Sequence, residues 1–207
     1  MRKLDLKEQY KELYTVPKGK IIDVAVPKLR YLMMDGQGDP NTSKEFQDAI
    51  AALYSLSYAL KFMVKNGAEA TDYGVMPLEG RWWADDMKDF AKLDKSKWKW
   101  TAMIMQPAFI TAKLVAAAKA ELIRRKKDLP ALGKVRLEDM KEGRCMQLLY
   151  IGPYSTEGPT IAKLHEHIQA QGLALTGKHR EIYLNDARRT VPEKLRTIIR
   201  QPVMSQV

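Results

Sequence analysis

HREIYLND, residues 179–186, has a counterpart earlier in the chain in PLEGRWW, residues 77–83. Each stretch places a glutamate among large aromatic side chains. Each also occupies the same position in a repeated order of predicted secondary-structure elements. Residues 31–105 and 145–203 both run strand, glycine-bearing turn, helix and two further strands. The sequence therefore predicts a duplicated module.

The duplication predicts an α+β fold in which two strand-helix-strand-strand modules form antiparallel sheets that frame a central pocket. We expect an N-terminal arm over 1–20 and one domain over 21–207. Within that domain, module one covers 21–106, a connecting helix covers 107–128, and module two covers 129–207. A glutamate beside aromatic rings in both modules suits a flat, cationic or electrophilic guest.

Local signals predict the elements of the first half. Thr42 and Glu45 have the spacing of a capping box, and Asn66-Gly67 is typical of a helix end. The expected elements are a strand over 24–34, a turn over 35–40, a helix capped by Thr42 and ended by residues 65–67, strands over 73–83 and 98–105, and a helix that Pro107 opens and that runs to about 127.

The second half is more compact. Pro159 suits the first turn of a helix, and Gly172 suits its end. The expected elements are a short strand over 135–137, a turn over 141–143, a strand over 144–151, a turn over 152–155, a helix ending before 172, and strands over 181–184 and 196–200.

The chain has 207 residues and a net charge of +10, which invites a nucleic-acid interpretation. The basic residues are scattered, however. The densest run, RRKK at 124–127, falls at a predicted helix end, where cations complement the helix dipole. We expect no direct nucleic-acid binding and no membrane association.

Cys145 is the single cysteine, so no disulfide can form within the chain. Its apolar neighbours predict a buried, inert thiol, and we expect a reducing cytoplasmic location. His165 and His167 stand two apart on a predicted helix and do not face each other. We expect no metal site and no cofactor.

Four strings in order resemble GyrI-like small-molecule-binding proteins, in the branch that stands alone without a DNA-binding domain. They are PLEG with Trp82-Trp83; IGPY at 151–154 with Glu157, Pro159-Thr160 and Lys163-Leu164-His165; residues 179–186 with Arg188-Arg189; and TIIRQPV at 197–203. The resemblance covers roughly residues 20–203.

The resemblance implies two modules around a central pocket. Relatives include the effector-binding halves of multidrug-sensing regulators and a DNA gyrase inhibitor, and some stand-alone members hydrolyse cyclopropane rings of DNA-alkylating natural products. The chain departs from the family at Tyr150, where histidine is common, and at Arg81, where the family is often apolar. Both departures bear on the shape and charge of the pocket.

Glu181 is the first candidate for chemistry. Side chains alternate along a strand, so Glu181 shares a face with Tyr183 while Ile182 and Leu184 share the other. If the apolar pair packs under the helices, the carboxylate points to the opposite, concave side. There it would neutralise a cation or act as a general base toward water. The alternative is an exposed carboxylate paired with Arg180 or Arg188.

Glu157 and Tyr154 are the other catalytic candidates. Glu157 opens a helix, where an acid is favourable for electrostatic reasons alone, or it works with Glu181 as a second carboxylate. Tyr154 on its turn either covers the core or reaches inward to stack or donate a proton. The candidate ligand-binding residues are Trp82, Trp83, Glu79, Trp100, Tyr150 and Tyr183.

The tryptophans leave two interpretations open. Trp82 and Trp83 should point to opposite faces, one into the core and one lining the pocket, and Trp98 and Trp100 should share a face. Glu79 and Arg81 also share a face and could form a local ion pair.

Three functions remain open at this point. In the first, water adds to a strained or electrophilic ring, as in a cyclopropanoid cyclopropyl hydrolase. In the second, the same pocket captures lipophilic or cationic drugs without turnover. The third is a protein-interaction role such as gyrase inhibition, which no particular residue supports. The expected partner is a small-molecule ligand.

Overall fold

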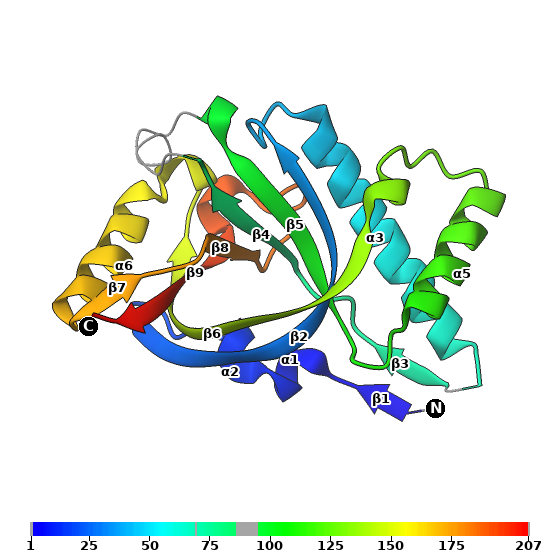
Figure 1. Cartoon of the computed structure of the whole chain (residues 1–207), viewed down its shortest axis with the longest axis horizontal. Coiled ribbons are helices and arrows are strands. Elements are labelled where there is room, and N and C mark those ends of the chain that lie inside the picture. The colour runs from blue at the N-terminus through cyan, green and yellow to red at the C-terminus, as the bar shows by residue number, and fades with distance from the viewer. Residues whose placement is uncertain (1, 69, 86–94, 207) are drawn as a thin grey trace. The chain divides into compact units, whose positions relative to one another are not determined.

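A computed structural model describes residues 2–68, 70–85 and 95–206, and the same order of elements occurs in it twice (Figure 1). The first copy consists of β2 (Ile21–Gln37), α3 (Lys44–Lys65), β3 (Thr71–Tyr73), β4 (Leu78–Trp83) and β5 (Lys99–Gln106). The second consists of β6 (Arg136–Ile151), α6 (Gly158–Ala170), β7 (Leu173–Leu175), β8 (His179–Tyr183) and β9 (Arg196–Ser205). The predicted α+β duplication is confirmed.

The remaining elements precede, join or interrupt the two copies. They are β1 (Arg2–Leu4), α1 (Leu6–Gln9), α2 (Lys11–Tyr14), α5 (Ala112–Arg124), and the short 3-10 turns η1 (Lys95–Lys97), η2 (Leu132–Lys134), η3 (Tyr154–Thr156) and η4 (Pro192–Lys194). Among the described helices, none combines the length and the apolar character that crossing a bilayer requires.

Seven strands pair in the order β6-β2-β5-β4-β8-β9-β7, and β6 pairs with β9 as well, so the order of pairing closes on itself. β9 is antiparallel to β6, to β7 and to β8. Closing the pairing in this way satisfies strand edges that would otherwise remain open. β1 and β3 form a separate parallel pair.

The chain forms two compact units, and each draws on both halves of the sequence. The first unit contains 1–9, 29–76 and 82–140, and the second contains 10–28, 77–81 and 141–207. The segment that we expected to form an N-terminal arm contributes to both units. β1 joins β3 in the first unit, while Leu13 and Tyr14 of α2 are buried in the second.

In the first unit, α3 packs its apolar stripe beside tryptophans. The Phe46 ring contacts the rings of Trp82 and Trp100 at centroid distances of 5.5 and 4.9 Å. Ser43 caps this helix by accepting from the Phe46 amide at 3.2 Å. The expected capping box was therefore placed one residue early, at Thr42. The helix ends at Lys65 with Asn66 as its C-cap, as the Asn66-Gly67 signal predicted.

Three other sequence expectations need correction. The expected strand over 73–83 is two strands, β3 and β4. The helix expected to open at Pro107 begins at Ala112, because Thr111 provides the cap by accepting from the Leu114 amide. The turn expected at 141–143 is part of the continuous strand β6. Gly143, with φ of 83°, takes up the left-handed backbone there without ending the strand.

Candidate functional site

The second unit places β8 beside β9 and beneath α6. Directly opposed residues in antiparallel strands point to the same face. Glu181 pairs with Ile199, and Ile199 in turn pairs with Leu148 of β6. Ile199 and Leu148 belong to the apolar cluster that includes Leu164 and Ile168 of α6. Glu181 therefore lies on the face of the sheet that α6 covers.

This placement reverses one sequence expectation and confirms another. We expected Ile182 to lie under the helix and Glu181 to lie on the opposite face, and the register shows the reverse. Glu181 and Tyr183 do share a face, as the strand alternation predicted, because the Tyr183 hydroxyl donates to Glu181 Oε2 at 2.7 Å. The error arose because alternation pairs side chains by face without saying which face a helix covers.

The Glu181 carboxylate is nearly enclosed, with its side chain 7% exposed. Its Oε1 lies 3.3 Å from His179 Nε2, and its Oε2 accepts from Tyr183. His179, two residues earlier on the same strand face, was missed as a site residue in the sequence. The signal was present, since a residue at i−2 on a strand shares the face of residue i.

Tyr154, at the start of η3, stands over this carboxylate–phenol pair. Its ring meets the Tyr183 ring edge-on, with centroids 5.5 Å apart. Burial raises the pKa of Tyr183 well above its usual value, and the negative charges of Glu181 and Glu157 raise that pKa further. The Tyr183 phenol therefore keeps its proton at neutral pH. Both Tyr154 and Glu157 are half-buried.

Tyr150 closes the turn that carries Tyr154. Its hydroxyl donates to the Pro153 carbonyl oxygen at 2.8 Å and lies 2.8 Å from Thr156 Oγ1. Gly152 has φ of 149°, and a Cβ atom there would lie 2.6 Å from the Tyr150 hydroxyl. Tyr150 thus fixes the loop, and the structure places the carboxylate–tyrosine cluster beside it: Glu181, Tyr183, His179, Tyr154 and Glu157.

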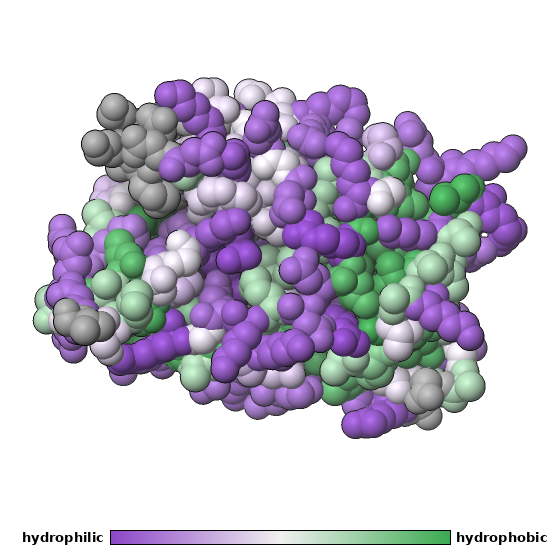
Figure 2. Space-filling view, viewed as in Figure 1, coloured by the Kyte–Doolittle hydropathy of each residue, from purple (hydrophilic) through white to green (hydrophobic). Residues whose placement is uncertain are grey.

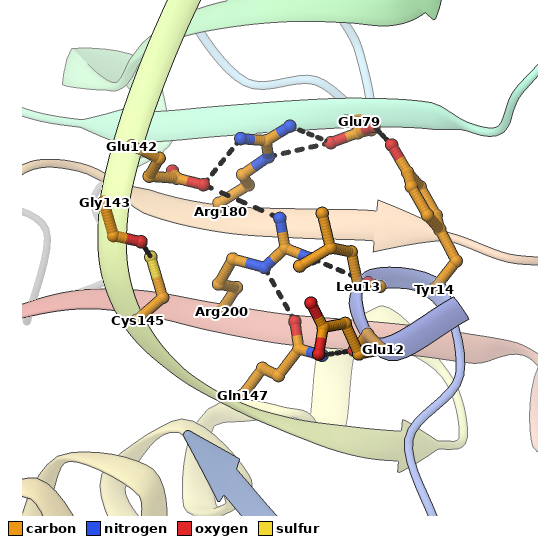
Figure 3. A network of polar contacts seen from close by, with 10 residues as sticks. All are labelled: Glu12, Leu13, Tyr14, Glu79, Glu142, Gly143, Cys145, Gln147, Arg180 and Arg200. Carbon is orange, nitrogen blue, oxygen red and sulfur yellow. Dashed lines mark hydrogen bonds and ion pairs between the residues drawn. The ribbon is translucent and has the colours of Figure 1, made fainter. Parts of the chain in front are cut away.

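Glu79 takes part in a different group of side chains on the opposite face of β8 (Figure 3). It accepts from the Tyr14 hydroxyl at 2.7 Å and from Arg180 Nε at 2.8 Å. The local ion pair expected between Glu79 and Arg81 is therefore replaced by a pair with Arg180. Both the Glu79 and the Arg180 side chains are fully buried.

Arg180 and Arg200 are directly opposed in the register of β8 and β9, so their charges repel. Glu142 lies between them, with Oε2 2.6 Å from Arg180 Nη1 and 3.6 Å from Arg200 Nη1 (Figure 3). Arg200 also donates to Gln147 Oε1 at 2.7 Å. Two arginines and two glutamates thus neutralise one another inside the second unit.

The arginines proposed as alternative partners of Glu181 pair with other carboxylates. Arg180 serves Glu79 and Glu142, and Arg188 pairs with Asp186 at 2.9 Å. The alternative of an exposed, arginine-paired Glu181 is therefore wrong.

The tryptophan candidates belong to the first unit, whereas Glu79 belongs to the second. Trp82 and Trp100 are core residues against Phe46, whereas Trp83 is half-buried, as expected for opposite faces of one strand. Trp98 contacts Trp82 at a centroid distance of 5.9 Å. Cys145 is buried, as predicted, and burial raises the pKa of its thiol to about 12.

Comparison with known proteins identifies the family. Residues 22–204 match the GyrI-like small molecule binding domain, and the chain belongs to this family. No curated protein matches. An uncharacterized conserved protein from Listeria innocua is 37% identical, with a TM-score of 0.88 over 97% of this chain and 100% of that one.

Two further structures are similar. A hydrolase from Listeria innocua is 37% identical, with a TM-score of 0.84 over 97% of this chain and 100% of that one. The EcmrR C-terminal domain is 12% identical, with a TM-score of 0.57 over 90% of this chain and 98% of that one, and it shares the fold.

Proposed function

We propose that this protein hydrolyses an electrophilic, strained-ring small molecule at the carboxylate–tyrosine cluster. The observation that carries the proposal is the enclosed Glu181 carboxylate, which accepts a hydrogen bond from Tyr183 and lies 3.3 Å from His179 Nε2, while the neighbouring arginines pair with other carboxylates. A carboxylate in such a largely enclosed site can accept a proton from a reacting water.

The proposed substrate is a flat compound with a cyclopropane ring conjugated to a carbonyl group. Water forms a C–O bond to the ring methylene, and the ring C–C bond breaks. The electron pair of that bond passes to the carbonyl oxygen. Glu181 accepts a proton from the water, Tyr154 donates one to the new oxyanion, and Tyr154 regains it from Glu181 through solvent. The sum is addition of one water, with no cofactor.

The aromatic rings supply positioning. Tyr154 and Tyr183 meet edge-on and offer faces to a flat guest, and holding the guest near an oriented water removes much of the entropic barrier. Glu157 adds negative charge near Tyr183, which favours a guest that develops positive charge at the attacked carbon. Relatives of 37% and 36% identity are described as hydrolases, which supports turnover.

Capture without turnover is the second candidate. The same cluster suits a lipophilic cation, because a buried carboxylate beside aromatic faces attracts positive charge. In that case the protein would sequester drugs or sense them. We propose a cytoplasmic location for either function, where the buried thiol of Cys145 needs no disulfide partner.

Turnover is tested by incubating the full chain with a cyclopropane-bearing DNA alkylator and following the products by mass spectrometry. We expect a product heavier by one water. Glu181→Gln should lower the rate about 100-fold or more, as loss of a general base does. Glu166→Gln, an exposed carboxylate on α6, is the matched control and should leave the rate unchanged.

Unchanged compound, combined with saturable binding that Glu181→Gln weakens, would support capture instead. Unchanged compound and no binding would overturn both candidates. Retained turnover in Glu181→Gln would remove this carboxylate from the mechanism.

A further inference from the structure

A groove runs between α3 and α5 in the first unit. Its lining residues lie within 54–66 and 121–127, and none of them belongs to the carboxylate–tyrosine cluster. Its volume is about 570 Å³, within the range of small-molecule sites. Leu122 of α5 lines the groove and is buried. The groove lining includes Tyr54, Tyr58, Phe62, Leu122, Arg125 and Lys127.

One wall of the groove is a ladder of aromatic rings on α3. Tyr54, Tyr58 and Phe62 recur every four residues, so they lie on one face of the helix. Successive ring centroids are 6.5 Å apart, with interplanar angles of 28° and 24°. Tyr58 and Phe62 are 48% and 51% exposed. Hydrophobic side chains gather between α3 and α5 on the molecular surface (Figure 2).

The other wall is basic. Arg125 and Lys127 line it, together with Glu121. Glu121 is neutralised locally, since Arg124 Nε and Arg125 Nε each lie 2.7 Å from its oxygens. Hydrogen bonds from Arg124 and then Arg125 hold the pKa of Glu121 at about 2. The wall therefore keeps an excess of positive charge beside the aromatic ladder.

The backbone at the end of α5 brings Lys127 to this wall. Lys126 has φ of 51°, a left-handed conformation that favours glycine. The Lys126 amide donates to the Ile123 carbonyl and the Lys127 amide to the Leu122 carbonyl, which makes a Schellman motif. A lysine stands where glycine would be more stable, and the chain turns back so that Lys127 lines the groove.

We propose that this groove is a second ligand site, which binds a planar aromatic molecule carrying an anionic group such as a carboxylate. The ring system lies against Tyr58 and Phe62, and the anion lies at Arg125 and Lys127. This anionic ligand class differs from both the electrophilic ring compound and the lipophilic cation considered for the carboxylate–tyrosine cluster, and the two sites share no residue.

The probe is 2-naphthoate, titrated into the full chain by isothermal calorimetry, with neutral 2-naphthamide as its isosteric comparison. We expect saturable binding of naphthoate that weakens as salt rises, and at least fivefold weaker binding of the amide. Phe62→Ala should weaken naphthoate binding about fivefold through lost ring contact. Lys127→Gln should weaken it about threefold, as removal of one exposed cation does.

Two matched controls separate this site from other effects. Lys113→Gln removes a cation from an exposed position of α5 outside the groove lining and should leave naphthoate binding unchanged. Glu181→Gln should also leave naphthoate binding unchanged. The proposal for the groove can therefore be tested separately from the proposal for the carboxylate–tyrosine cluster. Phe62 and Lys127 are exposed, and circular dichroism of both variants should match that of the wild type.

Three results would overturn the proposal. The first is equal affinity for naphthoate and naphthamide. The second is loss of naphthoate binding in Glu181→Gln but not in Phe62→Ala. The third is dimerisation of the chain in sedimentation velocity that Phe62→Ala abolishes, which would make the groove an interface between two copies.

Discussion

Arg180 and Glu181 are neighbours in the chain, yet their side chains leave β8 on opposite faces and join separate groups. Arg180 lies between Glu79 and Glu142 in the buried ionic network. Glu181 joins Tyr183 and His179 beneath α6. The short strand thus carries a structural charge on one face and a candidate catalytic charge on the other, and substitutions can test the two roles separately.

Arg180→Met should destabilise the protein by about 3–5 kcal/mol, because it leaves Glu79 and Glu142 buried with one cation fewer. Denaturant unfolding followed by circular dichroism measures the change. Arg188→Met is the control, since the Arg188 side chain is 86% exposed, and its effect should stay within about 0.5 kcal/mol. Equal effects of the two variants would contradict a structural role for the network.

Tyr183→Phe should cost about 1–3 kcal/mol at pH 7, because the Glu181 carboxylate loses a hydrogen bond from a phenol. The pKa of Tyr183 is raised in the folded state, so its contribution is complete below the unfolded value near 10 and is lost as pH rises through the folded value. The difference in unfolding free energy between wild type and Tyr183→Phe should therefore shrink above pH 10.

Tyr58→Phe, which removes an exposed hydroxyl, controls for the general effect of losing a phenol. Its unfolding free energy should remain within about 0.5 kcal/mol of the wild type at pH 7 and at pH 11. A Tyr183→Phe difference that stays constant from pH 7 to pH 11 would contradict the buried phenol–carboxylate pair.

The features of the fold that local periodicity and turn chemistry control could be predicted from the sequence. The duplicated order, the end of α3 before its C-cap Asn66 and the shared face of Glu181 and Tyr183 follow from patterns within a few residues. Gly143 misled the prediction because glycine with a positive φ can end a strand or bend one. Which of these occurs depends on the partner strand, which local sequence does not specify.

The long-range contacts of the site could not be predicted in this way. Glu79 and Arg180 are 101 residues apart, and their pairing depends on the order of the strands rather than on either local motif. The face that carries Glu181 likewise depends on the register with Ile199 and on the position of α6. His179 was recoverable, because the same alternation that linked Glu181 to Tyr183 also applies to it.

Lys126→Gly should stabilise the protein by about 0.5–1 kcal/mol, because glycine adopts the left-handed backbone of this helix end without steric cost. Thermal unfolding measures the shift. Ala117→Gly, at an exposed position in the middle of α5, should have the opposite effect and destabilise by about 1 kcal/mol. If both variants are destabilised, the contacts of the Lys126 side chain stabilise the fold by more free energy than its left-handed backbone costs.

Gly36 allows the Trp100 indole to lie against the backbone of β2. The two residues are directly opposed in the β2–β5 register, and a Cβ atom on Gly36 would lie 2.2 Å from the Trp100 ring. Trp100 is fully buried and also contacts Phe46, so the ring has little room to move. Gly36→Ala should therefore destabilise the protein by about 2–3 kcal/mol, the cost of overpacking a core.

Gly74→Ala is the matched control, because a Cβ atom at Gly74 would meet no atom within 4 Å. Its unfolding free energy should stay within about 1 kcal/mol of the wild type, and it can rise because alanine restricts the unfolded chain. Tryptophan fluorescence should shift in Gly36→Ala and not in Gly74→Ala. If Gly36→Ala unfolds like the wild type, the Trp100 indole can move to accept a Cβ atom at position 36. The close packing of Trp100 against Gly36 described above would then be wrong.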